Sequence, residues 1–187
     1  ISRVLGLARD IVIAGTFGAS ASVDAFLVAF RLPNFLRRLF AEGAFSQAFV
    51  PVLSEYKERH ERDEVRGLIA NVFGVLGGVL LLVSLAGVLA APVLVAIFAP
   101  GFIDEGDKFD LTVGMVRITF PYILFVSLTA FAGATLNTYG RFGVPAFTPA
   151  LLNISLILCA VLLAPHFSRP VVALAVGVLL AGVVQLL

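Results

Sequence analysis

Charged and amide side chains recur at helical spacing inside an apolar stretch that covers residues 24–56. They are Asp24, Arg31, Asn34, Arg37, Arg38 and Glu42. A helix turns by about 100° per residue, which places four of these side chains within about 40° of one another. The four are Asp24, Arg31, Arg38 and Glu42, and Asn34 and Arg37 extend the same face. The guanidinium group is a planar fork of N–H donors that matches phosphate or pyrophosphate bidentately. The chemistry predicted for this face is therefore the binding of an anion.

A second polar stripe precedes it. Its members occupy an arc of about 120° on a helix, and they are Ser2, Arg3, Gly6, Arg9 and Asp10. One alternative is that Arg3 or Arg9 merely pairs with Asp10, or lies at the headgroup level where a long side chain snorkels. Because the same pattern recurs on the next predicted helix, we favour a wet cavity shared by the two stripes.

The composition explains why these stripes need a cavity. Hydrophobic residues make up 60% of the 187-residue chain and charged residues only 13%, with a mean hydropathy of +1.05, which is typical of an integral membrane protein. A charge at the bilayer centre costs about 2.5 to 3.5 kcal/mol on insertion scales. The charged side chains of the two stripes must therefore face protein or water.

We predict an all-α fold, a polytopic membrane bundle of about six transmembrane helices in one domain that covers residues 1–187. Long uncharged runs between Arg66 and Asp104, Arg117 and Arg141, and Arg141 and Arg169 each have room for a span of about 20 residues. The predicted helices cover about 1–16, 23–42, 67–98, 111–138, 145–164 and 170–187. We expect the domain to be truncated at both ends, because the first helix is short for a span and the last stops within an apolar run.

Smaller features add local expectations. Pro51 is predicted to break the chain after the second helix, and residues 55–66 to form a solvated helical turn at the membrane surface. Gly74 and Gly78 form a GxxxG pair that permits close helix packing. Asp24 has a second possible role, since a carboxylate in the first turn of a helix complements the helix dipole.

Basic residues in the short loops indicate the orientation. The loops after the second and fourth predicted helices carry five bases, and the loops on the opposite side carry two. The five are Lys57, Arg59, Arg62, Arg66 and Arg141, and the two are Lys108 and Arg169. This bias predicts a cytoplasmic N-terminus and an outside location for the acidic loop 100–110.

Several classes of chemistry lack their motifs. The sequence has no nucleophile elbow, phosphate loop, metal cluster or catalytic carboxylate pair, so we predict no catalytic residues, no metal and no cofactor. Its bases are intramembrane or balanced by acids, which argues against a nucleic-acid partner. The residues alone favour a transporter or flippase for an anionic substrate. The alternatives are a membrane-embedded lipid-processing enzyme and a structural scaffold.

Five runs of the sequence carry a family resemblance. They are SRVLGLARD at 2–10, DAFLVAFRLPNFLRRLFAEGAFSQAFVPVLSEY at 24–56, APGF at 99–102, ITFPYI at 118–123 and LNTYGRFGVPAFTPALLN at 136–153. These runs closely resemble the bacterial lipid II flippases known as MurJ or MviN. The resemblance implies a fourteen-helix transporter of two six-helix lobes and two further helices, of which this chain is the N-terminal lobe.

The resemblance also implies roles for individual residues. Arg3, Arg9 and Arg37 match the arginines proposed to hold the substrate pyrophosphate, and Asp10 matches a carboxylate that orients them. The supporting or gating positions are Ser2, Asp24, Asn34 and Glu42, with Asp24 near the periplasmic mouth and Glu42 involved in closing the cytoplasmic side.

The activity implied is the movement of lipid II, the lipid-linked peptidoglycan precursor, from the inner to the outer leaflet of the bacterial cytoplasmic (inner) membrane by alternating access. The implied partners are lipid II, membrane lipids and the missing C-terminal lobe of the same chain. The alternative within the superfamily is a multidrug or oligosaccharide-lipid exporter.

Overall fold

The computed structural model describes the backbone of residues 2–18, 20–37 and 44–187, and the side chains of 3–18, 20–35 and 48–187. Every regular element within these ranges is helical, so the predicted all-α class is confirmed. The α-helices are α1 (Ser2–Phe17), α2 (Ala21–Arg37), α3 (Ala44–Arg59), α4 (Arg62–Leu89), α5 (Ala91–Phe98), α6 (Gly106–Thr119), α7 (Tyr122–Thr138), α8 (Gly143–Leu158) and α9 (Val172–Leu186).

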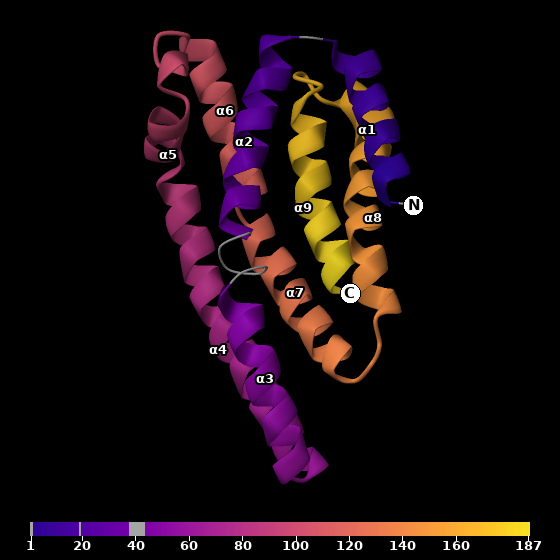
Figure 1. The fold of residues 1–187 in the computed structure, drawn as a ribbon. Coiled ribbons are helices and arrows are strands. Elements are labelled where there is room, and N and C mark those ends of the chain that lie inside the picture. Colours follow the sequence, from indigo (N-terminus) through magenta and orange to yellow (C-terminus); the bar gives the residue numbers. More distant parts are fainter. Residues whose placement is uncertain (1, 19, 38–43) are drawn as a thin grey trace.

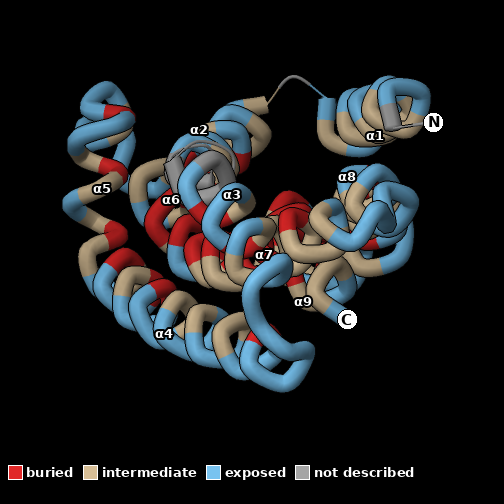
Figure 2. The backbone as a smooth tube through the Cα atoms, turned by 60° about the horizontal axis from the view of Figure 1, so that its bottom comes forward, coloured by how far each residue is buried: buried red, intermediate tan, exposed pale blue. Residues whose placement is uncertain are grey.

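Three helical stretches of the described chain are long and apolar enough to cross a membrane. They are Arg62–Leu89, Gly106–Thr138 and Gly143–His166, and Val172–Leu186 is a shorter apolar helix. In the most apolar part of Gly106–Thr138, 61% of the residues are buried. In the corresponding part of Arg62–Leu89, only 17% are buried. The stretch formed by α6 and α7 is therefore the centre of the bundle, and α4 turns most of its surface outward (Figure 2).

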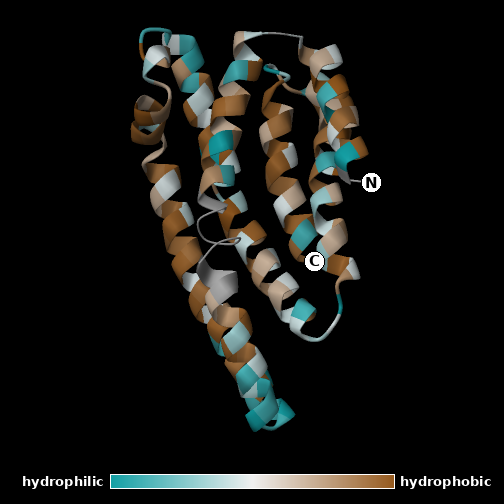
Figure 3. Ribbon diagram, viewed as in Figure 1, coloured by the Kyte–Doolittle hydropathy of each residue, from teal (hydrophilic) through white to brown (hydrophobic). Residues whose placement is uncertain are grey.

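The helices run side by side between two ends (Figure 1). The α1–α2, α5–α6 and α8–α9 connections lie together at one end, which we call the mouth end. At the opposite end, α3 and the first part of α4 project beyond the α7–α8 turn as a helical pair, which we call the arm. The tip of the arm is its most hydrophilic part (Figure 3).

Two prolines divide spans that the sequence predicts as single helices. The range 67–98 forms α4 and α5, with Ala90 between them and Pro92 in the first turn of α5. The range 111–138 lies within α6 and α7, which begin earlier than predicted because α6 starts at Gly106, and Pro121 immediately precedes α7. Proline lacks an N–H and its ring clashes with the carbonyl four residues earlier. Each break therefore follows from the proline at that place.

The arm differs from the expectation in two respects. Pro51 lies inside α3 and does not break it, which membrane helices tolerate when neighbouring groups satisfy the freed carbonyl. The charged run 55–66 continues α3 to Arg59 and starts α4 at Arg62, so it is helical on both sides of a two-residue junction. The predicted end of the second helix at residue 42 lies outside the described residues.

Close helix approach depends on glycines other than the predicted pair. A Cβ added to Gly87 of α4 would lie 1.8 Å from the Phe120 ring, and one added to Gly182 of α9 would lie 2.8 Å from the Tyr122 ring. Nothing lies within 4 Å of the corresponding position at Gly74 or Gly78. The close packing that the GxxxG pair permits is not used within the described chain, where the pair faces open space.

Candidate anion site on α1 and α8

Among the predicted arginines whose side chains the structure describes, Arg9 on α1 makes hydrogen bonds to two other side chains. Its Nε and Nη2 donate to Oδ1 of Asp10 at 2.9 and 2.6 Å. Its Nη1 donates to Oδ1 of Asn153 on α8 at 3.1 Å. The guanidinium is thus held by a carboxylate on its own helix and by an amide from a helix far along the chain.

The two contacts differ in burial. The Asp10 side chain is 63% exposed and that of Arg9 is 24% exposed, so the ion pair is partly screened by solvent and contributes little stability. Asn153 is buried, and its Nδ2 donates to the Pro149 carbonyl at 3.4 Å. The value of this arrangement lies in orientation, because the guanidinium plane is fixed from two directions.

Part of the guanidinium stays available. A guanidinium carries five N–H groups, and the contacts with Asp10 and Asn153 engage three of them. One N–H on each terminal nitrogen of Arg9 is not used by these contacts. Donors of this kind suit a phosphate oxygen, which accepts charge-assisted hydrogen bonds.

A groove of about 370 Å³ lies beside this arginine, between α1, α2 and α8. Apart from Arg9 and Asp10 its lining is apolar or small, and consists of Ile13, Ala14, Gly18, Val23, Phe26, Leu27, Phe30 and Leu156. The rings of Phe26 and Phe30 stack in it, 5.7 Å apart between centroids. An apolar pocket with a few convergent polar groups is the usual form of a small-molecule site.

The α1–α2 turn borders the same groove. Gly18 in this turn has φ = 63°, a left-handed conformation that glycine adopts without the steric cost of a Cβ. After this turn α2 runs back along the bundle, with the groove between it and α1. Helix α1 begins at about the height in the bundle where α2 ends (Figure 1), so the two polar stripes overlap along the bundle axis.

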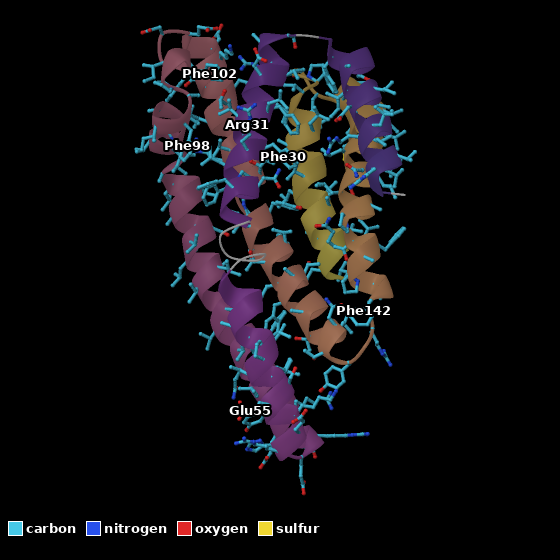
Figure 4. All side chains as sticks on the ribbon, viewed as in Figure 1. Phe30, Arg31, Glu55, Phe98, Phe102 and Phe142 are labelled. Atoms are coloured by element: carbon cyan, nitrogen blue, oxygen red, sulfur yellow. The ribbon has the colours of Figure 1, made fainter. Side chains whose placement is uncertain are left out.

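The other predicted site residues make no hydrogen bond or ion pair with the Arg9 site that the structure shows, or lie outside the described side chains. Arg3 is exposed on α1, Asn34 is half-buried on α2, and Arg31 is exposed on α2, next to Phe30 (Figure 4). The backbone of Ser2 and Arg37 is helical, but their side chains lie outside the described ones, as do all atoms of Arg38 and Glu42.

Asp24 belongs to a different cluster. It lies in the first turn of α2 at the mouth end, and its Oδ2 is 3.9 Å from Nζ of Lys108 on α6. The same Nζ is 3.7 Å from Glu105 and 4.0 Å from the centre of the Phe102 ring. This cluster borders a cavity of about 770 Å³ between the three connections of the mouth end. The structure therefore separates Asp24 from the Arg9 groove.

Asn153 and Lys108 are the residues that sequence reasoning missed. Asn153 is a polar residue within the apolar run of 145–164, which signals a partner in the bundle, but its partner is 144 positions away. Lys108 is the one base among the acids of loop 100–110, and it had been counted only as a marker of orientation.

The described residues contain no group of three or more His, Cys, Asp or Glu side chains that could hold a metal ion. A cation that is held by Asp10 and Asn153 beside an apolar groove can bind the charged part of an amphipathic anion. The fold and the site together define a helical membrane protein whose bundle holds a paired arginine beside an apolar groove.

The comparisons with known proteins identify the family. The family model described as lipid II flippase MurJ matches residues 13–187, and the chain belongs to this family. It is similar to the probable lipid II flippase MurJ of Vibrio cholerae, with 51% identity over 100% of this chain and 37% of that protein. It is equally similar to the lipid II flippase MurJ of Burkholderia cenocepacia, with 51% identity over 100% of this chain and 36% of that protein.

A solved structure supports the same assignment. A lipid II flippase MurJ in an inward closed conformation superposes with a TM-score of 0.83 at 30% identity, and the match covers 99% of this chain and 38% of that one. The chain thus spans a little over a third of the length of the relatives that it matches. The family is one of flippases, which are transporters and not enzymes.

Proposed function

We propose that this chain is the N-terminal lobe of a flippase that carries lipid II from the inner to the outer leaflet of the cytoplasmic membrane. The observation that carries the proposal is the Arg9 guanidinium, held by Asp10 and Asn153 beside an apolar groove in the bundle. Such a site suits a ligand with a pyrophosphate next to hydrocarbon. The family of the chain supplies the same substrate.

The charge of Arg9 must be stabilised inside the membrane bundle, and a path for an anionic substrate would make use of it. An arginine inside a membrane bundle is costly unless it faces protein or water, and Arg9 meets this condition through its two partners. Arg3 continues its stripe on α1, and Arg37 ends α2 at a similar height in the bundle. In our proposal these three arginines neutralise the pyrophosphate while the lipid tail stays in the bilayer.

The second lobe completes the cavity in this proposal. Many transporters move a substrate by rocking two bundles about a site near the middle of the membrane. Ser2 and Asn34 then support the arginines. Asp24 acts at the periplasmic mouth and Glu42 closes the cytoplasmic side, with its partner in the other lobe.

The orientation proposed is a cytoplasmic N-terminus in the bacterial inner membrane. The arm carries four of the bases, and the α7–α8 turn with Arg141 lies toward the same end of the bundle (Figure 1). The mouth end carries Lys108 and Arg169 amid acidic residues. The excess of bases on cytoplasmic loops supports placing the arm in the cytoplasm.

The role of Arg9 is tested with alanine variants of the full-length protein in a cell depleted of its own flippase. Arg9→Ala is expected to abolish growth support at normal protein level, because the pyrophosphate loses its best-held donor. Arg59→Ala is the matched control, since Arg59 lies on the arm and pairs only with Glu55, at 2.9 Å, among the described residues. Normal growth with Arg9→Ala would contradict the proposal.

The substrate is tested by native mass spectrometry of the full-length protein with lipid II and with phosphatidylglycerol, an unrelated anionic lipid. We expect retention of lipid II and weaker retention of phosphatidylglycerol, because a pyrophosphate presents more acceptor oxygens to the arginines. Equal retention of both lipids would reduce the site to a general anion site and overturn the substrate assignment.

The orientation is tested with single cysteines at Glu61 on the arm and Asp104 at the mouth end, labelled in intact cells by a membrane-impermeant thiol reagent. Asp104→Cys is expected to react and Glu61→Cys to react only after lysis. The reverse pattern would place the arm outside.

A further inference from the structure

We propose that Asn153 is a positioning residue for Arg9, and that it is an amide so that it can hold the guanidinium from α8 without adding a second negative charge to the Arg9–Asp10 pair. The inference rests on the proposed function, because it takes the ligand of Arg9 to be the pyrophosphate of a lipid. It adds a residue from α8 to a site otherwise formed by the first two helices.

The geometry gives Asn153 a fixed direction. Its Nδ2 donates to the Pro149 carbonyl one turn earlier on α8, at 3.4 Å. This hydrogen bond leaves the carboxamide oxygen turned to Arg9, where it accepts from Nη1 at 3.1 Å. A rotation of the amide would lose both bonds, so the acceptor stays directed at Arg9.

Asn153 is a buried polar residue in a mostly apolar helix. It is 7% exposed. A buried amide without partners costs about 1 to 3 kcal/mol, whereas a leucine there would carry no such risk. The hydrogen bond to Arg9 is one function of this buried amide that an apolar side chain could not supply.

The charge balance explains why the residue is not a carboxylate. Asp10 already offsets the charge of Arg9 through two hydrogen bonds. A second carboxylate at 153 would give this trio a net negative charge beside the groove, and it would repel a pyrophosphate. The neutral oxygen of Asn153 supplies the acceptor and leaves the balance unchanged.

Three variants of the full-length protein separate orientation from charge. Asn153→Ala removes the acceptor and keeps the charge balance, Asn153→Asp keeps an acceptor and adds a negative charge, and Asp10→Asn/Asn153→Asp exchanges the carboxylate and the amide around Arg9. The measurements are the dissociation constant for lipid II by native mass spectrometry, the half-saturating lipid concentration of flipping in vesicles, and the melting temperature.

Asn153→Asp is expected to weaken lipid II binding and raise the half-saturating concentration by about tenfold or more, with the maximal rate at saturation retained. Asn153→Ala is expected to weaken binding by about three- to tenfold, the loss of one hydrogen bond to a charged group. The exchange variant is expected to regain most of the affinity that Asn153→Asp loses. Asn137→Asp, which adds the same charge at an exposed position of α7, is the control and is expected to bind like the wild type.

Two results would overturn the inference. The first is wild-type affinity in Asn153→Asp at an unchanged melting temperature. The second is an exchange variant no better than Asn153→Asp, because a purely structural asparagine gives no reason for rescue by a change at Asp10. A wild-type protein that does not retain lipid II would instead overturn the proposed function, so the two failures are distinguishable.

Discussion

Each end of the bundle has a lysine over an aromatic ring, but the two lysines are held differently. At the mouth end, Nζ of Lys108 lies 4.0 Å from the centre of the Phe102 ring and within 4 Å of two carboxylates. At the arm, Nζ of Lys57 lies 4.2 Å from the centre of the Tyr139 ring and donates to the Thr138 carbonyl at 3.2 Å. At the mouth end the Lys108–Asp24 pair joins α6 to α2, whereas at the arm Lys57 of α3 donates to the last carbonyl of α7.

Burial makes the difference larger. The Lys108 side chain is 15% exposed, whereas Lys57 is exposed. A cation over an aromatic ring contributes about 0.5 to 1 kcal/mol at exposed sites and more when it is desolvated. The lysine of the mouth end should therefore matter more to stability than the lysine of the arm.

The arm compensates with apolar packing of its own. Four residues form a cluster separate from the main core, with Phe49 and Leu53 from α3, Val65 from α4 and Phe131 from α7. The Phe49 and Phe131 rings are 4.9 Å apart between centroids. Side-chain packing thus attaches the arm, whereas the mouth end adds to its apolar packing a lysine that pairs with two carboxylates, and this contrast can be tested by substitution.

The largest effect is expected from Leu53→Ala in the arm cluster. Leu53 is fully buried, and truncating a buried leucine costs about 2 to 5 kcal/mol of unfolding free energy. Hydrogen exchange of the full-length protein in detergent should show loss of protection in α3 while α2 stays protected. Val52→Ala is the control, because Val52 is 55% exposed. Equal loss in α2 would mean that the arm has no packing unit of its own.

The next effect is expected from Gly87→Ala, in the half of α4 away from the arm. The added methyl group would overlap the Phe120 ring, which is 3% exposed, and overpacking of a core costs about 1 to 3 kcal/mol. Gly74→Ala is the matched control in the same helix, with open space and a better helix former, so it should leave the melting temperature equal or slightly higher. A melting temperature of Gly87→Ala equal to that of Gly74→Ala would show that α4 does not approach α6 closely.

These glycines show where sequence reasoning stops. The helical class and the polar stripes followed from composition and from spacing along one helix, and both are local properties. Which glycine meets a neighbour depends on how two helices cross, so the spacing of Gly74 and Gly78 could show only that close packing is permitted there, and the close contact lies at Gly87. No pattern near Gly87 marked it, because its partner Phe120 lies 33 residues further along the chain, in the turn between α6 and α7.

The candidate site divides in the same way. Arg9 and Asp10 were placed on one polar stripe by their spacing, and the structure shows the Arg9–Asp10 pairing that the sequence left open as an alternative to a shared cavity. Asn153 was visible only as a polar residue in an apolar run, since its contact with Arg9 requires α1 and α8 to pack together. Proline type alone does not decide a break, because Pro92 and Pro121 lie at helix starts whereas Pro51 lies inside α3.

A smaller effect is expected from Lys108→Met, which removes the charge of the mouth cluster and keeps most of the side-chain volume. We expect a loss of about 1 to 2 kcal/mol of unfolding free energy, because a mostly buried cation loses its ring and both carboxylates. Glu105→Gln should cost less, since Asp24 remains. Thermal unfolding at low and high salt checks this, and the loss should shrink in high salt. A loss no larger than that of Glu105→Gln would contradict the charge-based tie at this end.

The smallest effect is expected from Lys57→Met on the arm. The exposed ammonium contributes about 0.5 kcal/mol through the Tyr139 ring and the C-terminal carbonyls of α7, and the cluster around Leu53 remains intact. Hydrogen exchange in α3 should therefore be nearly unchanged. Arg59→Met, two residues further along α3 and 72% exposed, gives the baseline for losing any arm cation. If Lys57→Met lowered the hydrogen-exchange protection of α3 as much as Leu53→Ala does, the arm would depend on charge like the mouth end. The contrast between the two ends would then disappear.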